Sequence, residues 1–347
     1  MILNYMNDLN NYEKKGILIK IFFLLILIII INILLFNNSK KYFFTYELKL
    51  YKKYIINCCR FKKYNISIKA KIAKNSNPYL SIIIPVYNME KYIERSILSI
   101  LNQSFQDFEI IIINDFSNDN SHLIIQKYQK IEDKIRIIVH NKNLGIYISR
   151  VEGIFNSKGQ YILLVDPDDI LLNPYLFENI YQINKNYNLD IIEFVVFYEE
   201  EGNNRLTIPN NHILNHFHSF SQNIIYHSQL SNILFFEPKN KNISGIICRS
   251  IWNKIIKKKI LLKTINFLGK DIYKYKNFNY AEDTIMNIIN FQFANNYSNI
   301  NTPGYLYNIR KKSVSHKKFG SYYDTLISKN VLLYLQLLYK YNNIYYI

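Results

Sequence analysis

The chain has 347 residues, of which 49% are hydrophobic, so it can bury the core of one large domain or two small ones. Its formal net charge of +17 points toward either nucleic acid or an anionic membrane surface. Three cysteines are too few for a disulfide framework. The sequence has no zinc-finger spacing and no aromatic–basic RNA-binding signature, so we expect no nucleic-acid partner.

An apolar segment near the N-terminus predicts a membrane anchor. Residues 21–36 carry no charge, and the flanking lysines are Lys20 and Lys40. The uncharged stretch between these lysines would span about 28 Å as a helix, close to the hydrocarbon thickness of a bilayer. A cleaved signal peptide would have a shorter apolar region followed by small residues. We therefore expect a tail over 1–15 and a retained single-pass anchor over 16–39.

A basic stem is predicted directly after the anchor, over 40–78. Between Lys40 and Lys74 the sequence has eleven Lys or Arg residues and one acid, Glu47. Because this charge follows an apolar segment, membrane lipids with anionic headgroups are the expected partners of the stem. More lysines flank the anchor on its C-terminal side than on its N-terminal side. The positive-inside rule therefore favours a cytoplasmic position for the rest of the chain.

Strand and helix patterns alternate from residue 80 onward. Short apolar runs predict strands, and apolar residues at helical spacing predict helices. The predicted strands lie at 80–86, 108–113, 135–139, 161–165 and 190–197, and the predicted helices at 89–103, 121–128, 144–155 and 174–187. Strands separated by single helices imply right-handed crossovers. The sequence thus predicts an α/β fold with a Rossmann-like, mainly parallel sheet flanked by helices.

Polar residues follow three of the predicted strands. Pro85, Tyr87 and Asn88 lie at the end of the first strand, Asp115 follows the second, and the acidic segment 166–169 follows the fourth. In sheets of this kind, ligands bind beyond the carboxyl ends of the strands. The sequence therefore predicts a ligand site at this edge of the sheet.

Three acids, Asp166, Asp168 and Asp169, are crowded into the four residues after the fourth strand. Adjacent carboxylates repel one another, so such a cluster needs a cation or strong hydrogen-bond donors to remain ionised. Oxygen ligands with open positions suit a Mg²⁺ or Mn²⁺ ion that bridges phosphates. The alternative is a turn that caps the helix after Pro174, since Pro and Asp are ordinary turn residues.

Two interpretations are open for the other charged candidates. Asp115 either accepts a hydrogen bond from a nucleobase edge or starts an Asx turn. Glu282 and Asp283 precede a helical pattern over 284–290, where they either take part in chemistry or complement the helix dipole. Arg310 lies beside two lysines and either binds phosphate or is a solvated charge.

Together, these segments resemble the family-two glycosyltransferases with the GT-A fold. The resemblance runs in family order from residue 80 to residue 315. The matching segments are the opening strand and nucleotide loop (80–88), the second strand and its acid (107–117), the helix before the metal motif (143–153), the strand that ends in the DxD motif (159–169), the acceptor-side segments (252–254 and 282–283) and the closing loop with Arg310, Ser313 and Ser315. The resemblance implies a GT-A domain over 79–318 and leaves 319–347 as a C-terminal helix.

This resemblance implies a metal-dependent inverting glycosyltransferase that moves a sugar from a nucleotide-sugar, expected to be a UDP-sugar, to an acceptor hydroxyl. It implies that Asp168 ligates Mn²⁺ or Mg²⁺, that Asp166 holds the ribose or supports the metal, and that Asp115 contacts uracil. Asp283 would be the catalytic base, and Arg310 would offset phosphate charge. The other residues that it assigns to nucleotide or substrate binding are Pro85, Tyr87, Asn88, Arg150, Trp252 and Glu282. The acceptor, which could be a glycan, a lipid or a protein, is not specified.

The sequence departs from the family pattern at Phe116, where Gly is usual, and at Pro167, in the centre of the DxD motif. Neither departure removes a carboxylate. Two alternative functions are an inactive, membrane-tethered nucleotide-sugar-binding protein and a nucleotidyltransferase. The second would need a Gly- and Arg-rich phosphate loop after the first strand, which residues 87–90 do not provide.

Overall fold

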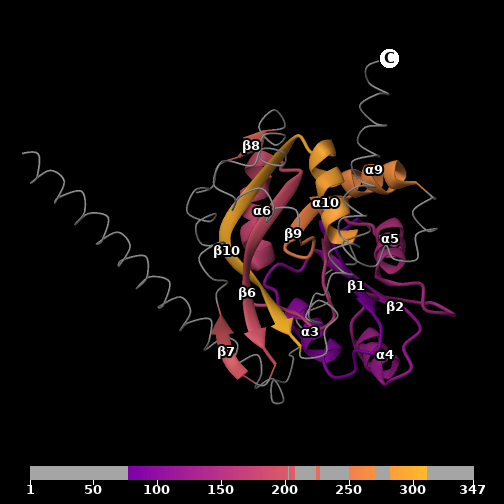
Figure 1. Cartoon of the computed structure of the whole chain (residues 1–347). Coiled ribbons are helices and arrows are strands. Elements are labelled where there is room, and N and C mark those ends of the chain that lie inside the picture. Colours follow the sequence, from indigo (N-terminus) through magenta and orange to yellow (C-terminus); the bar gives the residue numbers. More distant parts are fainter. Residues whose placement is uncertain (1–76, 202, 208–223, 227–249, 270–281, 311–347) are drawn as a thin grey trace, which may run out of the picture. The chain divides into compact units, whose positions relative to one another are not determined.

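The computed structural model describes residues 77–201, 203–207, 224–226, 250–269 and 282–310 (Figure 1). The chain divides into two compact units, Met1–Tyr64 and Asn65–Ile347, and all described residues belong to the second. The predicted tail, membrane anchor and C-terminal helix, and nearly all of the predicted stem, lie outside the described residues. Within the described ranges, no helix is both long enough and apolar enough to cross a membrane.

The described strands form one mixed sheet. Their bounds are β1 (Leu80–Val86), β2 (Phe108–Asn114), β3 (Ile135–Val139), β4 (Tyr161–Leu164), β5 (Ile170–Leu171), β6 (Ile191–Glu200), β7 (Asn203–Thr207), β8 (Ile225–Tyr226), β9 (Lys254–Lys257) and β10 (Asn296–Ile309). The order across the sheet is β3-β2-β1-β4-β9-β6-β10-β5, with β7 beside β6 and β8 beside β10.

The sheet is parallel in its first half, and its second half combines parallel and antiparallel pairs. Strands β3, β2, β1 and β4 are parallel neighbours, as the alternation of strands and helices predicts. Strand β9 is antiparallel to both β4 and β6, and β10 is parallel to β6 but antiparallel to β5 and β8. The prediction of a mainly parallel sheet is therefore wrong, because the sheet is mixed and most strand pairs in its second half are antiparallel. The regular alternation ends with β6, because β9 enters the sheet as a short strand that runs directly into a helix.

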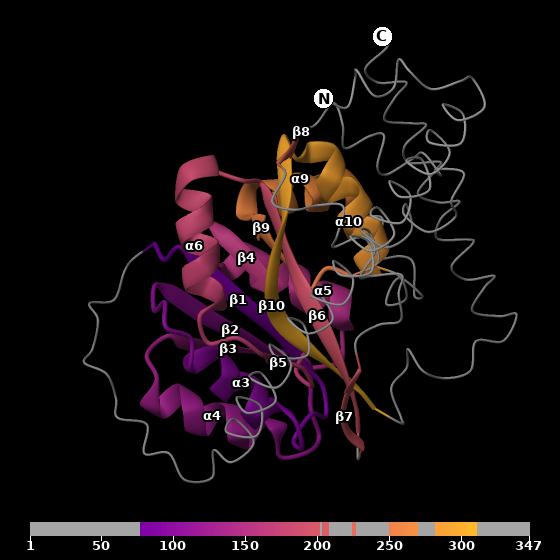
Figure 2. The same ribbon diagram turned by 90° about the vertical axis from the view of Figure 1, so that its left-hand side faces the viewer.

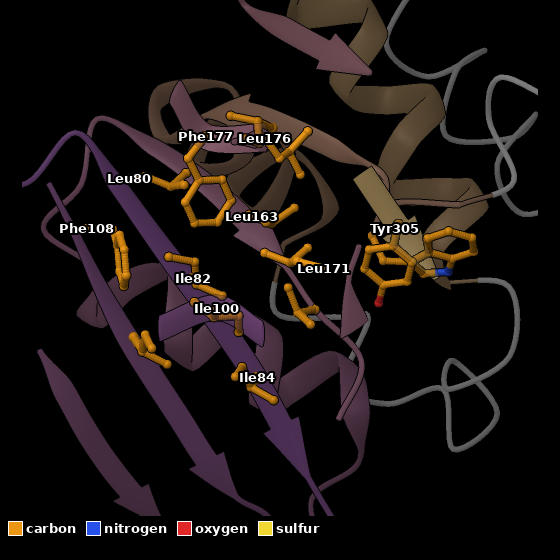
Figure 3. Close-up of a cluster of buried hydrophobic side chains, with 14 of the residues drawn as sticks. Leu80, Ile82, Ile84, Ile100, Phe108, Leu163, Leu171, Leu176, Phe177 and Tyr305 are labelled. Atoms are coloured by element: carbon orange, nitrogen blue, oxygen red, sulfur yellow. The ribbon is translucent and has the colours of Figure 1, made fainter. Parts of the chain in front are cut away.

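Helices cover both faces of the sheet (Figures 1 and 2). Strand β1 shows why, since Ile82 and Ile84 belong to one buried cluster and Ile83 to the other. Apolar residues on both faces are typical of parallel strands between two helical layers. The first cluster includes residues of α3 (Ile93–Leu101), α4 (Ser121–Ile131) and α6 (Leu176–Tyr187), and the second includes residues of α5 (Ile146–Asn156), α9 (Lys258–Leu268) and α10 (Glu282–Phe293). Figure 3 shows part of the first cluster, with Leu80, Ile82 and Ile84 along β1 and Tyr305 at its margin.

Helix α5 lies unusually close to the sheet at Gly153. A Cβ atom at this position would lie 2.3 Å from Ile83 Cγ2 and 2.9 Å from Ile113 Cδ1. Only glycine therefore allows this approach. This contact sets the distance between α5 and the strands β1 and β2. It therefore also sets the position of Arg150, which lies about one turn earlier on α5.

Strand β10 is irregular and was not predicted from the sequence. Its register with β6 shifts between Ile300 and Pro303 and again between Pro303 and Tyr305. Proline has no N–H group for the ladder, and such bulges turn a strand and change the direction of its side chains. The Pro303-Gly304 pair also interrupts the apolar pattern that would mark a strand in the sequence.

Candidate active site

The loops at the carboxyl ends of β1 and β2 are joined by hydrogen bonds. The Asn88 N–H donates to Ser117 Oγ at 3.1 Å, and the Asn118 N–H donates to Asn88 Oδ1 at 2.8 Å. Tyr87 is exposed on the first loop, whereas Pro85 is buried within β1. Of the predicted nucleotide contacts at this edge, Tyr87 and Asn88 are thus accessible, and Pro85 shapes the end of the strand.

Phe116 adopts the backbone conformation that glycine favours. Its φ angle is 65°, in the left-handed region, and its side chain is 46% exposed. A bulky residue rarely adopts this conformation. The departure from Gly at this position therefore changes the side chain while the turn itself is kept.

Asp115 is buried and is held by three protein groups. Its Oδ1 accepts from the Leu144 N–H at 2.7 Å, and its Oδ2 accepts from the Gly145 N–H at 2.8 Å. His140 Nδ1 lies 2.7 Å from Asp115 Oδ1, and Nε2 of the same ring lies 2.7 Å from Glu152 Oε2. Burial alone would lower the pKa of His140, but Asp115 and Glu152 raise it above its ordinary value. Asp115 thus fixes the turn before α5, and its contact with uracil stays a prediction.

Arg150, on α5, joins three of the predicted site acids. Its side chain is 1% exposed. Its Nη2 lies 2.8 Å from Asp166 Oδ1, and its Nη1 lies 3.0 Å from Glu282 Oε1. Nη1 also forms an ion pair with Asp283 Oδ1. Residues from α5, from the segment after β4 and from the start of α10 therefore meet at one point.

The pKa values of Arg150, Glu282 and Asp283 are shifted by burial and by the charges of this cluster. Burial alone would lower the pKa of Arg150, but Asp283, Asp166 and Glu282 raise it. Burial and the Asp283 charge raise the pKa of Glu282 well above its ordinary value, against the opposing effect of Arg150. Burial also raises the pKa of Asp283; Arg150 opposes this rise and Asp166 adds to it. Because one guanidinium faces three acids, the cluster favours the binding of a cation or the uptake of a proton.

Asp168 is paired with Arg310. Arg310 Nε lies 2.5 Å from Asp168 Oδ2, and the guanidinium carbon lies 5.4 Å from the centre of the Tyr92 ring. Arg95 Nη2 donates to the backbone oxygen of Asp168 at 2.7 Å. Burial and the Asp166 charge raise the pKa of Asp168 against the opposing effect of Arg310. Arg310 is thus already placed beside the predicted metal ligand.

Strand β10 supports the acidic segment from the other side. The Asn308 N–H donates to Asp169 Oδ1 at 2.8 Å, and the Asp166 N–H donates to the Tyr305 hydroxyl at 3.0 Å. Trp252 stacks on Tyr305 with ring centroids 4.7 Å apart. Trp252, predicted to lie on the acceptor side, is therefore linked to the acidic segment through one tyrosine.

Three residues near the site, Tyr92, His140 and Tyr305, were not predicted from the sequence. The two tyrosines gave no signal, because the chain contains 31 Tyr residues. His140 did offer one, since it directly follows the third predicted strand, as Asp115 follows the second. Side chains at strand ends are the ones that can reach a site at that edge.

The acids after β4 suit a divalent cation. The side chains of Asp168 and Asp166 are 13% and 20% exposed, whereas Asp169 is fully buried. A cation would relieve the repulsion that raises the pKa of Asp168. In the part of the chain that the structure describes, no group of three or more His, Cys, Asp or Glu side chains is arranged to hold a metal ion. Mg²⁺ commonly binds through one or two carboxylates plus substrate phosphates, so this donor set fits an ion that binds together with a diphosphate.

The predicted site residues thus fall into distinct groups. Arg150 contacts Asp166, Glu282 and Asp283, and Arg310 contacts Asp168. Trp252 is linked to the acidic segment through Tyr305. Tyr87 and Asn88 lie on the joined loops, whereas Pro85 and Asp115 are buried.

Several curated proteins with similar sequences are glycosyltransferases by name. Glycosyltransferase GlyA of Streptococcus pneumoniae serotype 4 is 26% identical over 240 residues, which cover 68% of this chain and 31% of GlyA. The putative glycosyltransferase EpsH of Bacillus subtilis is 25% identical over 262 residues, which cover 74% of this chain and 67% of EpsH. The uncharacterized glycosyltransferase EpsJ of the same organism is 37% identical over 132 residues, or 38% of each chain. The match thus spans well under half the length of GlyA and of EpsJ.

Solved structures of Staphylococcus aureus TarS, residues 1–349, have a similar fold. The complex with UDP-GlcNAc superposes with a TM-score of 0.52 at 20% identity and covers 70% of this chain and 62% of that chain. The complex with UDP gives 0.51 at 21% identity and covers 66% and 60%. The sequence model described as glycosyl transferase family 2 matches residues 81–263, which is more than half of the chain. The match includes the joined loops, Arg150 and the acidic segment after β4, and the chain belongs to glycosyl transferase family 2.

Proposed function

We propose that the chain is a metal-dependent inverting glycosyltransferase that transfers a sugar from a nucleotide-sugar, with a UDP-sugar as the expected donor, to an acceptor hydroxyl. The observation that carries the proposal is the convergence of Asp166, Glu282 and Asp283 on Arg150, next to the carboxyl end of β4. Family membership supports the same activity.

The donor class is supported by the TarS structures, which were solved in complex with UDP and with UDP-GlcNAc. We assign the nucleoside to the joined loops after β1 and β2, where Tyr87 offers an exposed ring. Asp115 would set the shape of this end of the site, because it fixes the turn before α5. The acceptor is a glycan, a lipid or a protein that presents a free hydroxyl.

In the proposed reaction, the acceptor oxygen attacks the anomeric carbon while the bond from that carbon to the diphosphate breaks. Asp283 takes the proton that the acceptor oxygen loses. A single displacement of this kind inverts the configuration at the anomeric carbon. The raised pKa of Asp283 makes it a stronger base than an ordinary Asp, and Arg150 holds its carboxylate in place.

Asp168, with support from Asp166, would hold Mn²⁺ or Mg²⁺. When bound, such a cation neutralises charge on the departing diphosphate. Arg310 lies against Asp168 and would offset further phosphate charge through hydrogen bonds. Asp168 and Arg310 thus serve the leaving group, and Asp283 serves the acceptor.

Calorimetry of UDP binding tests the donor site. We expect the full chain in detergent to bind UDP more tightly with Mn²⁺ than without it. Asp168→Asn should remove most of that difference, because an amide is a weaker ligand for a hard cation. Asp133→Asn, at an exposed acid in the loop before β3, is the matched control and should bind like wild type. Equal UDP affinity in all four combinations of metal and Asp168 variant would refute the assignment.

We also propose that residues 16–39 hold the enzyme in the membrane as a single-pass anchor and that the catalytic domain faces the cytoplasm. The uncharged stretch is long enough to span the hydrocarbon core. The basic residues of the stem favour anionic lipid and the cytoplasmic side.

A further inference from the structure

A fully buried charge pair lies beneath the turn that carries Trp252. Lys254 Nζ lies 3.3 Å from Glu193 Oε1, and the two side chains are 0% and 9% exposed. Replacing such a pair by apolar residues of similar size is often neutral or even stabilising, because both charges must be taken out of water. Stability alone therefore does not account for this pair.

The remaining hydrogen bonds of the pair go mainly to the turn over 250–253. Lys254 Nζ donates to the Ser250 carbonyl oxygen at 2.7 Å and to Asn253 Oδ1 at 2.9 Å. Asn253 Nδ2 donates to Glu193 Oε1 at 2.8 Å. The Tyr297 hydroxyl donates to Glu193 Oε2 at 2.6 Å and so fixes the acid from β10. The Glu193–Lys254 pair thus hydrogen-bonds both ends of the turn, at Ser250 and at Asn253.

The same turn also holds the start of α10. Asn287 Nδ2 donates to the Ser250 carbonyl oxygen at 2.7 Å, and the Ile251 backbone hydrogen-bonds the Asp283 carboxylate. Residues four apart lie on one face of a helix, so Asp283 and Asn287 present the same face to the turn. The Ser250 carbonyl therefore accepts from Lys254 on one side and from Asn287 on the other.

We infer that the Glu193–Lys254 pair is a positioning element for Asp283 and acts through the turn over 250–253. The inference rests on the proposed function, because it takes Asp283 as the base. The pair fixes the Ser250 carbonyl, that carbonyl fixes α10 through Asn287, and Ile251 aligns the Asp283 carboxylate itself. Trp252 lies in the same turn, so the acceptor-side ring and the base move together. Small displacements of a catalytic group of about 1 Å can cost ~10²-fold in rate.

The test compares two buried asparagines on α10. Asn287→Leu removes the bond to Ser250 and should lower kcat by about 10- to 100-fold, with the Kd for UDP in Mn²⁺ changed less than about 2-fold. Asn290→Leu is the control, because Asn290 is equally buried but its Oδ1 accepts from Thr264 Oγ1 at 2.6 Å, toward α9. This control should keep kcat, and the Tm of both variants is measured alongside.

Two further variants test the same positioning role in case Asn287→Leu does not fold. Tyr297→Phe removes only the hydroxyl that fixes Glu193 and should lower kcat several-fold at unchanged Kd. The paired change Glu193→Met with Lys254→Met should keep the Tm close to wild type while kcat falls. An unchanged kcat in the folded variants, or a loss in Asn290→Leu as large as in Asn287→Leu, would overturn the positioning role.

The same experiments distinguish a failure of the positioning role from a failure of the proposed function. If wild type transfers sugar and Asp283→Asn does not, the proposed function stands, and a full kcat in Asn287→Leu overturns the positioning role alone. If wild type shows no transfer with any donor, the proposed function itself fails.

Discussion

The pKa of Asp283 is shifted in opposite directions by its neighbours in the Arg150 cluster. Burial raises its pKa, Arg150 lowers it, and Asp166 raises it again. The net rise in pKa makes this carboxylate a stronger base than an ordinary Asp, which suits a general base. Glu282 is the adjacent acid, and its side chain is half as exposed as that of Asp283, at 9% against 18%. The greater exposure of Asp283 supports the proposal that Asp283 is the base and Glu282 its supporting neighbour.

Asp283→Asn should lower turnover by about 10²–10⁴-fold while UDP affinity stays nearly constant, because the amide cannot take the acceptor's proton. The fold should tolerate the change, since Asn is a good residue at a helix start and Arg150 keeps Asp166 and Glu282 as partners. Steady-state kinetics with calorimetry measures both quantities. Glu282→Gln is the neighbouring control and should lose less activity. Near-normal turnover in Asp283→Asn would exclude it as the base.

Phe116→Gly should increase the free energy of unfolding by up to about 1 kcal/mol. The left-handed backbone at Phe116 costs a bulky residue more than it costs glycine, although glycine also adds entropy to the unfolded chain. Asn188→Gly is the matched control, because Asn188 has a similar φ of 49° but asparagine tolerates this region. Denaturant unfolding compares the two. A loss of stability in Phe116→Gly would show that the aromatic ring packs in the folded state.

At the residue scale, the sequence predicted most of the acids that the structure brings together. Crowded carboxylates after an apolar strand, as at Asp166 and Asp168, are a local signal that can be read along the chain. The structure connects Asp283 to these residues through Arg150, and that contact depends on folding between distant segments. The role of Tyr305 depends on a bulge in a strand whose sequence has no regular pattern, so no local signal could reveal it.

At the scale of elements, the site lies where the regular half of the sheet meets the irregular half. Strands β1, β2 and β4 supply the loops and the acidic segment, and their bounds follow closely from apolar runs. Strand β9 begins two residues after Trp252, and β10 carries Tyr305, which stacks on Trp252, and Asn308, which hydrogen-bonds Asp169. Neither strand could be predicted from periodicity. In β9 two lysines lie in a buried four-residue strand, Lys254–Lys257, because each has a buried acid as its partner. A buried lysine whose partner lies far away in the sequence interrupts the apolar run by which a buried strand is usually predicted.

Gly153→Val should destabilise the domain by about 1–3 kcal/mol, because the added methyl groups would overlap with Ile83 and Ile113. The same change should lower activity, since α5 carries Arg150 and would be pushed away from the sheet. Phe155→Leu, at an exposed position on the same helix, is the control and should change stability by less than about 0.5 kcal/mol. Unfolding in denaturant together with kinetics measures both effects. Unchanged stability in Gly153→Val would mean that α5 is free to shift on the sheet.

At the scale of the whole molecule, most of the excess charge is separate from the chemistry. The segment between Lys40 and Lys74 has eleven basic residues and one acid, whereas the Arg150 cluster has one base and three acids. These opposite charges support the two proposals that the basic segment binds anionic lipid and that the acidic residues bind a cation.

Alkaline carbonate extraction tests the anchor. We expect the full chain to stay in the membrane pellet, since residues 16–39 include a stretch long enough to span the hydrocarbon core. A chain that lacks residues 1–39 should be released by carbonate, although the basic stem should still bind vesicles that contain anionic lipid at low salt. Release of the full chain by carbonate would contradict the anchor. Salt-independent vesicle binding by the shortened chain would contradict the electrostatic role of the stem.

The position of β10 also has a consequence for how the chain folds during its synthesis. This strand lies between β6 and β5, and the bond from the Asp190 N–H to Asn296 Oδ1 at its start spans 106 positions along the chain. Such distant pairing is slow, because the loop must lose its entropy before the contacts form. During synthesis at ~5–20 residues per second, β6 would wait several seconds or more for its partner, with an open edge that other chains could join. The strand that closes this edge also carries Tyr305 and Asn308, and Arg310 follows it directly. An unfinished chain is therefore both prone to association and unable to complete the proposed donor site.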